Sequence, residues 1–488
     1  MPCRTHGSAS PPKQQITIEF VPKAELDQAE QELDRLRRRN QTLEQENDRL
    51  RKELEEARRG QHRQTAPFSR RKRKTNPKPN GRKAGAAYGS HHRRSTPGKI
   101  DERYSAPLPG SCPCGGCTIQ DEIKTQYQEE IVRRKIVRQF DVAVGHCARC
   151  GKRLQGRHPL QTSDALDAAQ VQIGPEALAF AAHLNKRLGV SYENTAEALR
   201  IGFGLHISRS GVCRAVARMG RKAAPTYEAL TVALQQELVI WVDETGWKVD
   251  ATLHWMWVAV SAHIKVYAIL PGRGFDQVTQ LIEPDYDGCL EHDGWSVYYH
   301  FDKALHQSCL AHLMRRCRDL IEILSPGAAR FPLKVLELFD QALKLQARWQ
   351  SHQIGEHGLH SAAGRIEAGM ADLLEENYRN DSDRRLAQHL RHEQPWLFTF
   401  LYCPGVEATN NRAERAIRPA VMARRLCGGS RTENGARTQQ ILTSVLRTCC
   451  QQGKDSFRLI VDLLRSPSVQ TLDIIPAGLP RSDPTIRW

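Results

Sequence analysis

Three carboxylates, each in a distinct local setting, are the residues of this 488-residue chain best suited to do chemistry. Asp243 ends the apolar run Leu238–Val242, which is typical of a buried strand. Asp293 follows a shorter strand-like stretch and precedes Gly294, and Glu414 lies where helical spacing resumes. Mg²⁺ prefers carboxylate oxygens and keeps water ligands that a substrate phosphate can displace. The pattern therefore predicts a magnesium site.

The charge balance indicates which kind of phosphate-containing substrate would bind at such a site. With 71 Lys and Arg against 55 Asp and Glu, the chain carries a formal charge of +16, so nucleic acid is the first partner to consider. Most of the acids are expected to be solvated, but Asp243 closes an apolar run, where a charge is costly unless it serves a ligand. Alternation places Glu244 on the opposite strand face. Asp293 has nearby rivals, namely Asp285, Asp287 and Asp302.

The third carboxylate belongs to a helix with a polar face. Asn410, Glu414 and Arg418 share that face at intervals of four residues. An arginine beside a metal ligand is suited to touching a phosphate, and the Asn side chains are candidates to cap the helix. The alternative is an intrahelical Glu414–Arg418 ion pair, which contributes only a few tenths of a kcal/mol.

The surrounding pattern predicts an α/β layer that carries these residues. Strands followed by helices indicate an α/β core in two parts, residues 236–304 and 405–450, separated by a helical insertion at 305–404. Early in that insertion, Cys309-x-x-His312 has the spacing of half a metal site. The sequence shows no evident partners for it, so side chains that pack a helix are the preferred interpretation. The expected strands are 238–243, 254–260, 264–270 and a stretch around 289–293, with a helix around 276–283. Residues 451–488 are a C-terminal segment, with a loose tail after Ser466.

The first modules predict self-association and phosphate binding. After a tail at 1–23, residues 24–58 carry five heptads with Asn40 and Asn47 at core positions, a pattern typical of a parallel, in-register coiled coil. A homodimer or higher oligomer is expected, and a single solvated helix is the alternative. Residues 59–105 form a basic linker that contains Arg70, Arg71, Lys72, Arg73 and Lys74, suited to sequence-independent contacts with DNA phosphates or to service as a tether.

Two cysteine pairs predict a zinc module at residues 106–158. Cys114 with Cys117 and Cys147 with Cys150 form two Cys-x-x-Cys knuckles, which can supply four thiolates to one tetrahedral Zn²⁺. Residues 131–140 resemble a strand hairpin that presents them, and Cys112 is a substitute ligand. Free or redox-active thiols are the alternative. The clustering favours metal ligation in a reducing compartment over disulfides.

Residues 159–235 read as a helical DNA-binding domain. Thr195–Ile201 and Ser208–Arg218 flank a glycine-containing turn, as in a helix-turn-helix. An ordinary helical pair fits this weak signal equally well.

Four motifs carry a family resemblance. They are Asp243-Glu-Thr, Asp293-Gly-Trp-x-x-Tyr298, Cys309-x-x-His312-x-x-Arg315-Arg316 and Asn410-Asn411-x-x-Glu414-Arg415-x-Ile417-Arg418-Pro419. Taken together, they resemble the DDE transposases of the bacterial insertion-sequence-66 family. The resemblance covers most of the chain, and its most specific part is the motif that begins at Asn410. The finger departs from the usual pattern through its Cys-Pro-Cys-Gly-Gly-Cys opening, and Trp295 stands where Tyr is common.

The resemblance implies a ribonuclease H-like core in which Asp243, Asp293 and Glu414 form a catalytic triad that binds two Mg²⁺ or Mn²⁺ ions. It implies cleavage of transposon ends and strand transfer into target DNA, with Arg415 and Arg418 near the phosphates and a structural Zn²⁺ in the finger. DNA and a second copy of the chain are the expected partners, and other element-encoded proteins stay open. No run of 18 apolar residues exists, so the bacterial cytoplasm at the nucleoid is expected, without a membrane partner.

Two other functions remain as alternatives. One is a non-catalytic zinc-finger DNA-binding regulator, or an inactive transposase derivative. In zipper transcription factors, however, the basic region precedes the zipper as a continuous helix, whereas here it follows and contains prolines. The other is a ribonuclease H-type or junction-cutting nuclease, which shares the metal site but needs neither the insertion nor a dimerising N-terminus.

Overall fold

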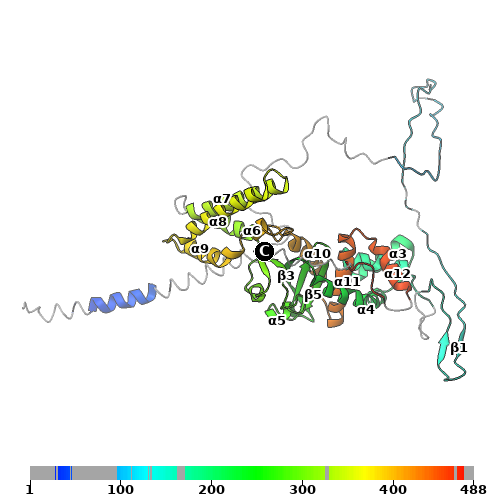
Figure 1. The fold of residues 1–488 in the computed structure, drawn as a ribbon. Helices are drawn as coiled ribbons and strands as arrows, with labels where there is room; N and C mark the ends of the chain where they lie inside the picture. The colour runs from blue at the N-terminus through cyan, green and yellow to red at the C-terminus, as the bar shows by residue number, and fades with distance from the viewer. Residues whose placement is uncertain are drawn as a thin grey trace, which may run out of the picture. The chain divides into compact units, whose positions relative to one another are not determined.

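The computed structural model divides the chain into two compact units, Met1–Glu129 and Glu130–Trp488, and each is described by itself (Figure 1). The predicted DNA-contacting tract from Arg70 to Lys74 and the substitute ligand Cys112 lie outside the described residues, so their roles stay predictions. The described residues are 28, 31–43, 46, 96–111, 113–129, 131, 134–161, 171–324, 329–466 and 470–476.

A helix in the first unit covers residues 31–43, inside the predicted coiled coil. Leu33, Leu36 and Leu43 occupy heptad core positions, and 49%, 56% and 49% of their surfaces are exposed. Apolar side chains on one stripe of a helix are normally covered by a partner. The exposure is compatible with a coiled coil between two copies, which remains a prediction.

The first cysteine knuckle lies in a turn of the first unit. The backbones of Cys117 and Ser111 form an isolated antiparallel β-bridge, and Gly115 inside the knuckle has a φ of +86°. A positive φ costs glycine little because it has no Cβ. The chain reversal that brings Cys114 and Cys117 together therefore depends on this glycine.

The second knuckle lies in the second unit, in the turn of a two-stranded hairpin. Strand β1 (Val144–His146) pairs antiparallel with β2 (Arg153–Gln155). The amide of Gly151 donates to the carbonyl of Cys147 and closes the turn. The hairpin predicted at 131–140 is wrong for the described residues 131 and 134–140, which contain no strand. The hairpin is formed instead by β1 and β2, on either side of the turn that contains Cys147 and Cys150.

A five-stranded mixed sheet forms the centre of the second unit, in the order β5-β4-β3-β6-β7. Strands β3, β4 and β5 are antiparallel neighbours, whereas β6 runs parallel to β3 and β7 parallel to β6. Four strands match the predicted ones. The strands are β3 (Val239–Val249), β4 (Thr252–Val260), β5 (Lys265–Leu270), β6 (Cys289–His292) and β7 (Leu305–Ser308).

Strand β7 corrects the expectation that residue 305 begins a helical insertion. Its sequence is Leu-His-Gln-Ser, yet its last three residues are buried. Gln307 accepts a hydrogen bond from the amide of Phe400 (2.8 Å), and Ser308 donates to the carboxylate of Glu393. Since these partners lie about 90 residues later, the local pattern gave no sign of a strand.

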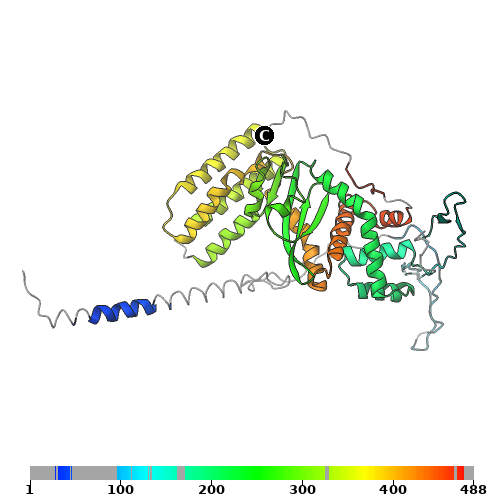
Figure 2. The same ribbon diagram turned by 90° about the horizontal axis from the view of Figure 1, so that it is seen from below.

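Alternation along β3 divides the core of the second unit into two layers. Ile240 and Val242 face one cluster of buried residues, and Val239 and Trp241 face the other. Figures 1 and 2 show α3, α4, α11 and α12 on one side of the sheet and the helices α7–α9 on the other.

The helices of each layer have the following bounds. The first layer contains α2 (Pro175–Ala182), the π-helix η1 (His183–Arg187), α3 (Tyr192–Phe203), α4 (Arg209–Leu234), α5 (Phe275–Val278), η2 (Ser296–His300), α11 (Glu433–Gln451) and α12 (Ser456–Arg465). The second contains α6 (Leu310–Ile323), α7 (Arg330–Gln350), α8 (Glu356–Glu375), α9 (Asp381–Glu393), η3 (Gln394–Trp396), η4 (Thr399–Leu401) and α10 (Asn411–Cys427).

Part of the predicted tail is packed. Leu472 is 8% exposed, and Ile474 is fully buried in the first layer. The amide of Leu472 donates to Thr226 Oγ1 (3.0 Å), and Gln452 Nε2 donates to the carbonyl of Ile474 (2.8 Å). The expectation of a loose end is therefore wrong for residues 470–476, because two apolar side chains among polar neighbours complete the core.

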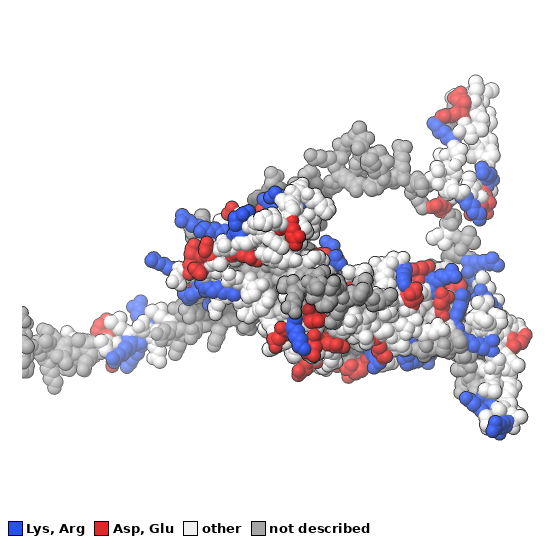
Figure 3. Space-filling view, in the orientation of Figure 1, with Lys and Arg blue, Asp and Glu red and all other residues white. Residues whose placement is uncertain are grey.

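The visible face of the second unit does not gather its charge in one patch. Acidic and basic side chains are interspersed over it (Figure 3). In the described part of the chain, no helix has both the length and the apolar character that a membrane crossing requires.

Candidate active site

Asp243 lies on β3, and Asp293 directly follows β6, the parallel neighbour of β3. The register pairs Val239 with Cys289 and Trp241 with Glu291, two residues before each acid. Parallel strands place their carboxyl ends at one edge of a sheet, where ligand sites commonly form. The fold thus brings the two acids to the same edge, and the charge of Asp293 acts on Asp243.

Glu414 enters from α10, which packs along β3. The side-chain amide of Asn410 donates to the carbonyl of Val242 (2.6 Å), and near the other end of the helix Arg424 donates to Thr245 Oγ1 (3.1 Å). These bonds attach the helix to β3 on both sides of Asp243. The prediction that the Asn410 side chain caps the helix is wrong, because that amide is used to reach β3.

The charges of Asp293 and Glu414 both act on Asp243, but these three acids do not form one of the groups of described residues whose ligand atoms all lie within 4.8 Å of one another. Burial raises the pKa of Asp243 well above its ordinary value, and the negative charges of Glu244, Asp293 and Glu414 raise it further. The amide of Glu244, which donates to Asp243 Oδ1 (2.8 Å), acts in the opposite direction. Clustered carboxylates of this kind are relieved by a proton or by a cation. An oxygen-only donor set suits a hard divalent ion.

Glu414 does not form the ion pair with Arg418 that was the alternative interpretation. Its Oε1 lies 3.7 Å from His312 Nε2 instead. Arg415 and Arg418 are exposed on α10, and neither makes an ion pair within the described residues. Both guanidinium groups are therefore exposed without an acidic partner among the described residues.

Glu244 faces the opposite side of the sheet, as alternation predicts. It accepts hydrogen bonds from Tyr298 Oη (2.6 Å) and Arg273 Nε (2.6 Å). The Arg273 guanidinium lies 4.0 Å from the ring centroid of Trp295 and 4.9 Å from that of Trp255. Sequence reasoning missed Arg273, whose only hint is its place between two glycines after β5. It neutralises a carboxylate whose pKa is raised by burial and by Asp293.

A histidine pair holds the segment that carries Asp293. His292 Nε2 and His306 Nδ1 are 3.2 Å apart, and the amide of Gly294 donates to His292 Nδ1 (3.1 Å). Burial and the neighbouring His306 hold the pKa of His292 well below its usual value. Gly294 has a φ of +89°, a conformation that disfavours side chains. Residue 294 thus turns the chain immediately after the second acid.

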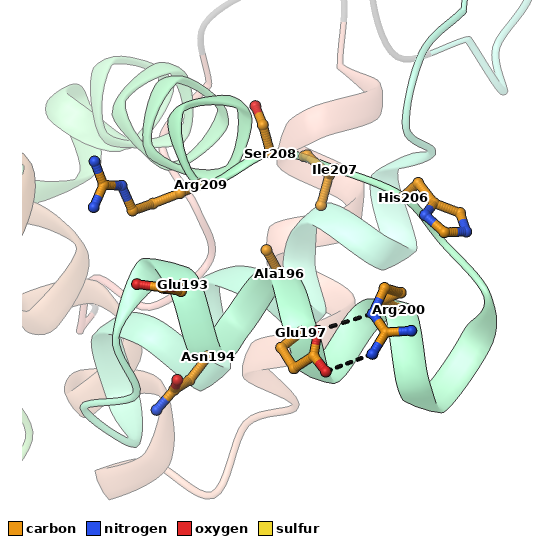
Figure 4. Close-up of a pocket in the computed structure, with 9 residues that line it drawn as sticks. All are labelled: Glu193, Asn194, Ala196, Glu197, Arg200, His206, Ile207, Ser208 and Arg209. Atoms are coloured by element: carbon orange, nitrogen blue, oxygen red, sulfur yellow. Dashed lines mark hydrogen bonds and ion pairs between the residues drawn. The ribbon is translucent and has the colours of Figure 1, made fainter.

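The helix pair that resembled a helix-turn-helix is present. Gly204 ends α3 in the left-handed conformation, and Ser208 caps α4 by accepting from the amide of Gly211 (3.0 Å). The two helices cross steeply beside a hollow of about 700 Å³ (Figure 4). None of the three acids contributes to the hollow, which is lined by Glu193, Asn194, Ala196, Glu197, Arg200, His206, Ile207, Ser208 and Arg209.

A profile of the family described as "Transposase IS66 family" matches residues 170–438, more than half of the chain. The chain belongs to this family. The matched residues include α3, α4, the whole mixed sheet, the insertion and α10, and with them all three carboxylates. The predicted family is therefore confirmed.

This IS66-family chain also resembles an uncharacterised protein, y4qI, of Sinorhizobium fredii. The two are 25% identical over 317 residues, which cover 59% of this chain and 57% of the relative. The chain therefore spans little more than half the length of that relative.

Proposed function

We propose that this transposase cuts DNA strands at the ends of its element and joins them to target DNA, with Asp243, Asp293 and Glu414 as the ligands of two divalent metal ions. The main support is the setting of Asp243, which is buried on the central strand and carries the electrostatic influence of Asp293 and Glu414. We further propose that the sheet is a ribonuclease H-like core. Three antiparallel strands followed by two parallel ones support that class.

The residues fit Mg²⁺ or Mn²⁺, because the donors are carboxylates and one of them is held in a position that disfavours its charge without a cation. Two such ions, when bound, would stabilise the attacking and leaving oxygens of an in-line displacement at phosphorus. The chain's part is to hold the ligands: β3 and β6 fix the two aspartates, and α10 brings Glu414 to them. Arg415 and Arg418, both exposed on α10, would contact the DNA phosphates.

DNA would also be held outside this centre. Arg214, Arg218 and Arg221 are exposed on one face of α4, and none forms an ion pair within the described residues. No acidic residue occurs in α4 before Glu228. We propose this face as a DNA contact. It would act beside the basic linker, a finger whose Zn²⁺ is bound by Cys114, Cys117, Cys147 and Cys150, and a coiled-coil dimer at the bacterial nucleoid.

The test is strand cleavage of labelled DNA from the borders of the element, with Mg²⁺ and the full chain. Asp243→Asn, Asp293→Asn and Glu414→Gln should each lower the rate by about a thousandfold or more while DNA binding is retained. Asp302→Asn and Asp285→Asn are the matched controls, since they remove carboxylates near Asp293 in sequence, and both should remain active.

Two outcomes would redirect the proposal. Loss of cleavage in Asp302→Asn together with full activity in Asp293→Asn would move the second ligand. If the wild-type chain binds border DNA but never cuts it under these conditions, a non-catalytic regulator becomes the better interpretation.

A further inference from the structure

Glu414 also belongs to a second set of donors, which combines sulfur, nitrogen and oxygen atoms. Cys309, His312 and Glu414 each offer a ligand atom, and these atoms all lie within 4.8 Å of one another. Cys309 precedes α6, His312 occupies its first turn, and Glu414 comes from α10. The Cys-x-x-His pair had no evident partner in the sequence. The fold supplies one that is about a hundred residues away along the chain.

Several buried polar atoms of this cluster have no hydrogen-bond partner. Glu414 Oε1 and His312 Nδ1 are both buried and unsatisfied. The 3.7 Å between Glu414 Oε1 and His312 Nε2 is too long for a hydrogen bond but short enough for two ligands of one ion. Buried polar atoms normally have partners, and a cation held by Glu414 and by one ring nitrogen of His312 would provide one for the carboxylate.

The cysteine sulfur of the cluster is buried beside a backbone donor. Cys309 is 2% exposed, and its Sγ accepts a hydrogen bond from the amide of Asn410 (3.1 Å). Hydrogen bonds to a ligating atom are a regular part of metal sites.

We propose that Cys309, His312 and Glu414 bind a Zn²⁺ ion, distinct from the zinc of the two cysteine knuckles. Sulfur, imidazole nitrogen and carboxylate oxygen are the donors that Zn²⁺ takes, with a water molecule as the fourth ligand. Mg²⁺ does not suit this set, because it prefers oxygen ligands alone. The ion would bind one carboxylate oxygen of Glu414 and leave the other free to turn toward Asp243. The zinc would thereby fix the orientation of the third proposed catalytic ligand.

The experiment measures the zinc content of the full chain by elemental analysis after metal removal, reloading with Zn²⁺ and desalting. Cys309→Ser and His312→Gln should each hold about one Zn²⁺ fewer per chain than the wild type. Cys317→Ser is the matched control, because Cys317 is a fully buried cysteine two turns later on α6, outside the cluster. Its zinc content should equal that of the wild type. Cys114→Ser/Cys117→Ser should lose the knuckle zinc independently.

Reloading with Co²⁺ gives a second readout that does not depend on activity. A thiolate ligand produces a sulfur-to-cobalt charge-transfer band. The Cys114→Ser/Cys117→Ser chain, called knuckle-deficient, should retain that band. Adding Cys309→Ser to it should abolish the band. Circular dichroism on the same samples identifies any variant that fails to fold. If Cys309→Ser does not fold, His312→Gln in the knuckle-deficient chain replaces it and should lose the bound metal. Equal zinc in the wild type and His312→Gln, or no zinc left once the knuckles are removed, would overturn the proposal. Both readouts measure metal binding and not DNA cleavage, so failure of the zinc site and failure of the triad assignment are distinguishable.

Discussion

The side-chain amide of Asn410 donates a 2.6 Å hydrogen bond to the carbonyl of Val242, one residue before Asp243. The backbone of the same asparagine contacts two other elements. Its amide donates to Cys309 Sγ (3.1 Å), and its carbonyl accepts from the amide of Glu414 (3.1 Å). One residue therefore ties together β3, the start of α6 and the start of α10, the elements that carry Asp243, His312 and Glu414.

We expect Asn410→Ala to leave the chain folded but to weaken the connection between β3 and α10. Removing the amide leaves the Val242 carbonyl without its donor, at a cost of about 1 to 3 kcal/mol in the free energy of unfolding. Strand cleavage should fall by at least tenfold because Glu414 loses its fixed distance from Asp243. Asn411→Ala is the control, since its side chain reaches only Thr409. Denaturant unfolding and cleavage rates check both, and unchanged cleavage in Asn410→Ala would contradict the positioning role.

The raised pKa of Asp243 predicts how the metal-free chain responds to pH. A carboxyl whose folded-state pKa lies above its ordinary value of 3.8 binds its proton more tightly when folded. The resulting loss of stability is absent below about pH 4, grows as the pH rises toward the folded-state pKa, and is constant above it. Asp243→Asn should therefore melt higher than the wild type at pH 7 without metal. Mg²⁺ should raise the melting temperature of the wild type only. The reverse order of the metal-free melting temperatures would contradict the repulsion among the acids.

The sequence predicted those parts of the site whose signals are local. An acid closing an apolar run marks Asp243 because burial on β3 follows directly from the run, and alternation correctly placed Glu244 on the other face. The motif around Glu414 lies on one helix. These inferences need only the periodicity of a strand or a helix.

The rest depends on partners that are far apart in sequence. Strand β7 is polar, and it can be buried only because Gln307 and Ser308 meet partners about 90 residues later. Cys309 and His312 gained a meaning only when α10 brought Glu414 to them. Arg273 is recognised by the two tryptophan rings beside it, and no motif announces it.

Lys186 predicts a gain of stability at alkaline pH. It is 9% exposed, and its Nζ donates to Tyr192 Oη (3.1 Å) and Gln439 Oε1 (2.9 Å). Burial lowers its pKa from 10.5 to about 8, so the unfolded chain binds the proton more tightly between those values. Stability should rise across that window, by about 3 kcal/mol at most. Unfolding by denaturant at pH 7, 8, 9 and 10 measures it. Lys186→Met should remove the rise, and an unchanged rise in that variant would assign it to other groups.

The exposed arginines of α4 predict a loss of DNA affinity on substitution. If Arg214 and Arg218 each contact a phosphate, the double alanine variant should lower the slope of log K against log salt by about 2. Arg348→Ala/Arg385→Ala is the control, with the same change of charge on exposed residues of α7 and α9. Fluorescence anisotropy with a 30-base-pair duplex, over a series of salt concentrations, gives both slopes. Equal slopes in the two double variants would show that α4 contributes only general charge.

The exposed leucines of the first unit predict an oligomer. Leu36 and Leu43 both occupy core positions, so Leu36→Asp/Leu43→Asp would bury four aspartates in a parallel dimer and should dissociate it. Arg38 lies on the outer face of the same heptads, and Arg38→Asp should leave the dimer intact. Light scattering coupled to size exclusion gives the mass of each full-length variant, to be compared with 55.2 kDa for one chain. A monomeric wild type, or a dimer that survives the double aspartate substitution, would remove the coiled coil as the site of self-association.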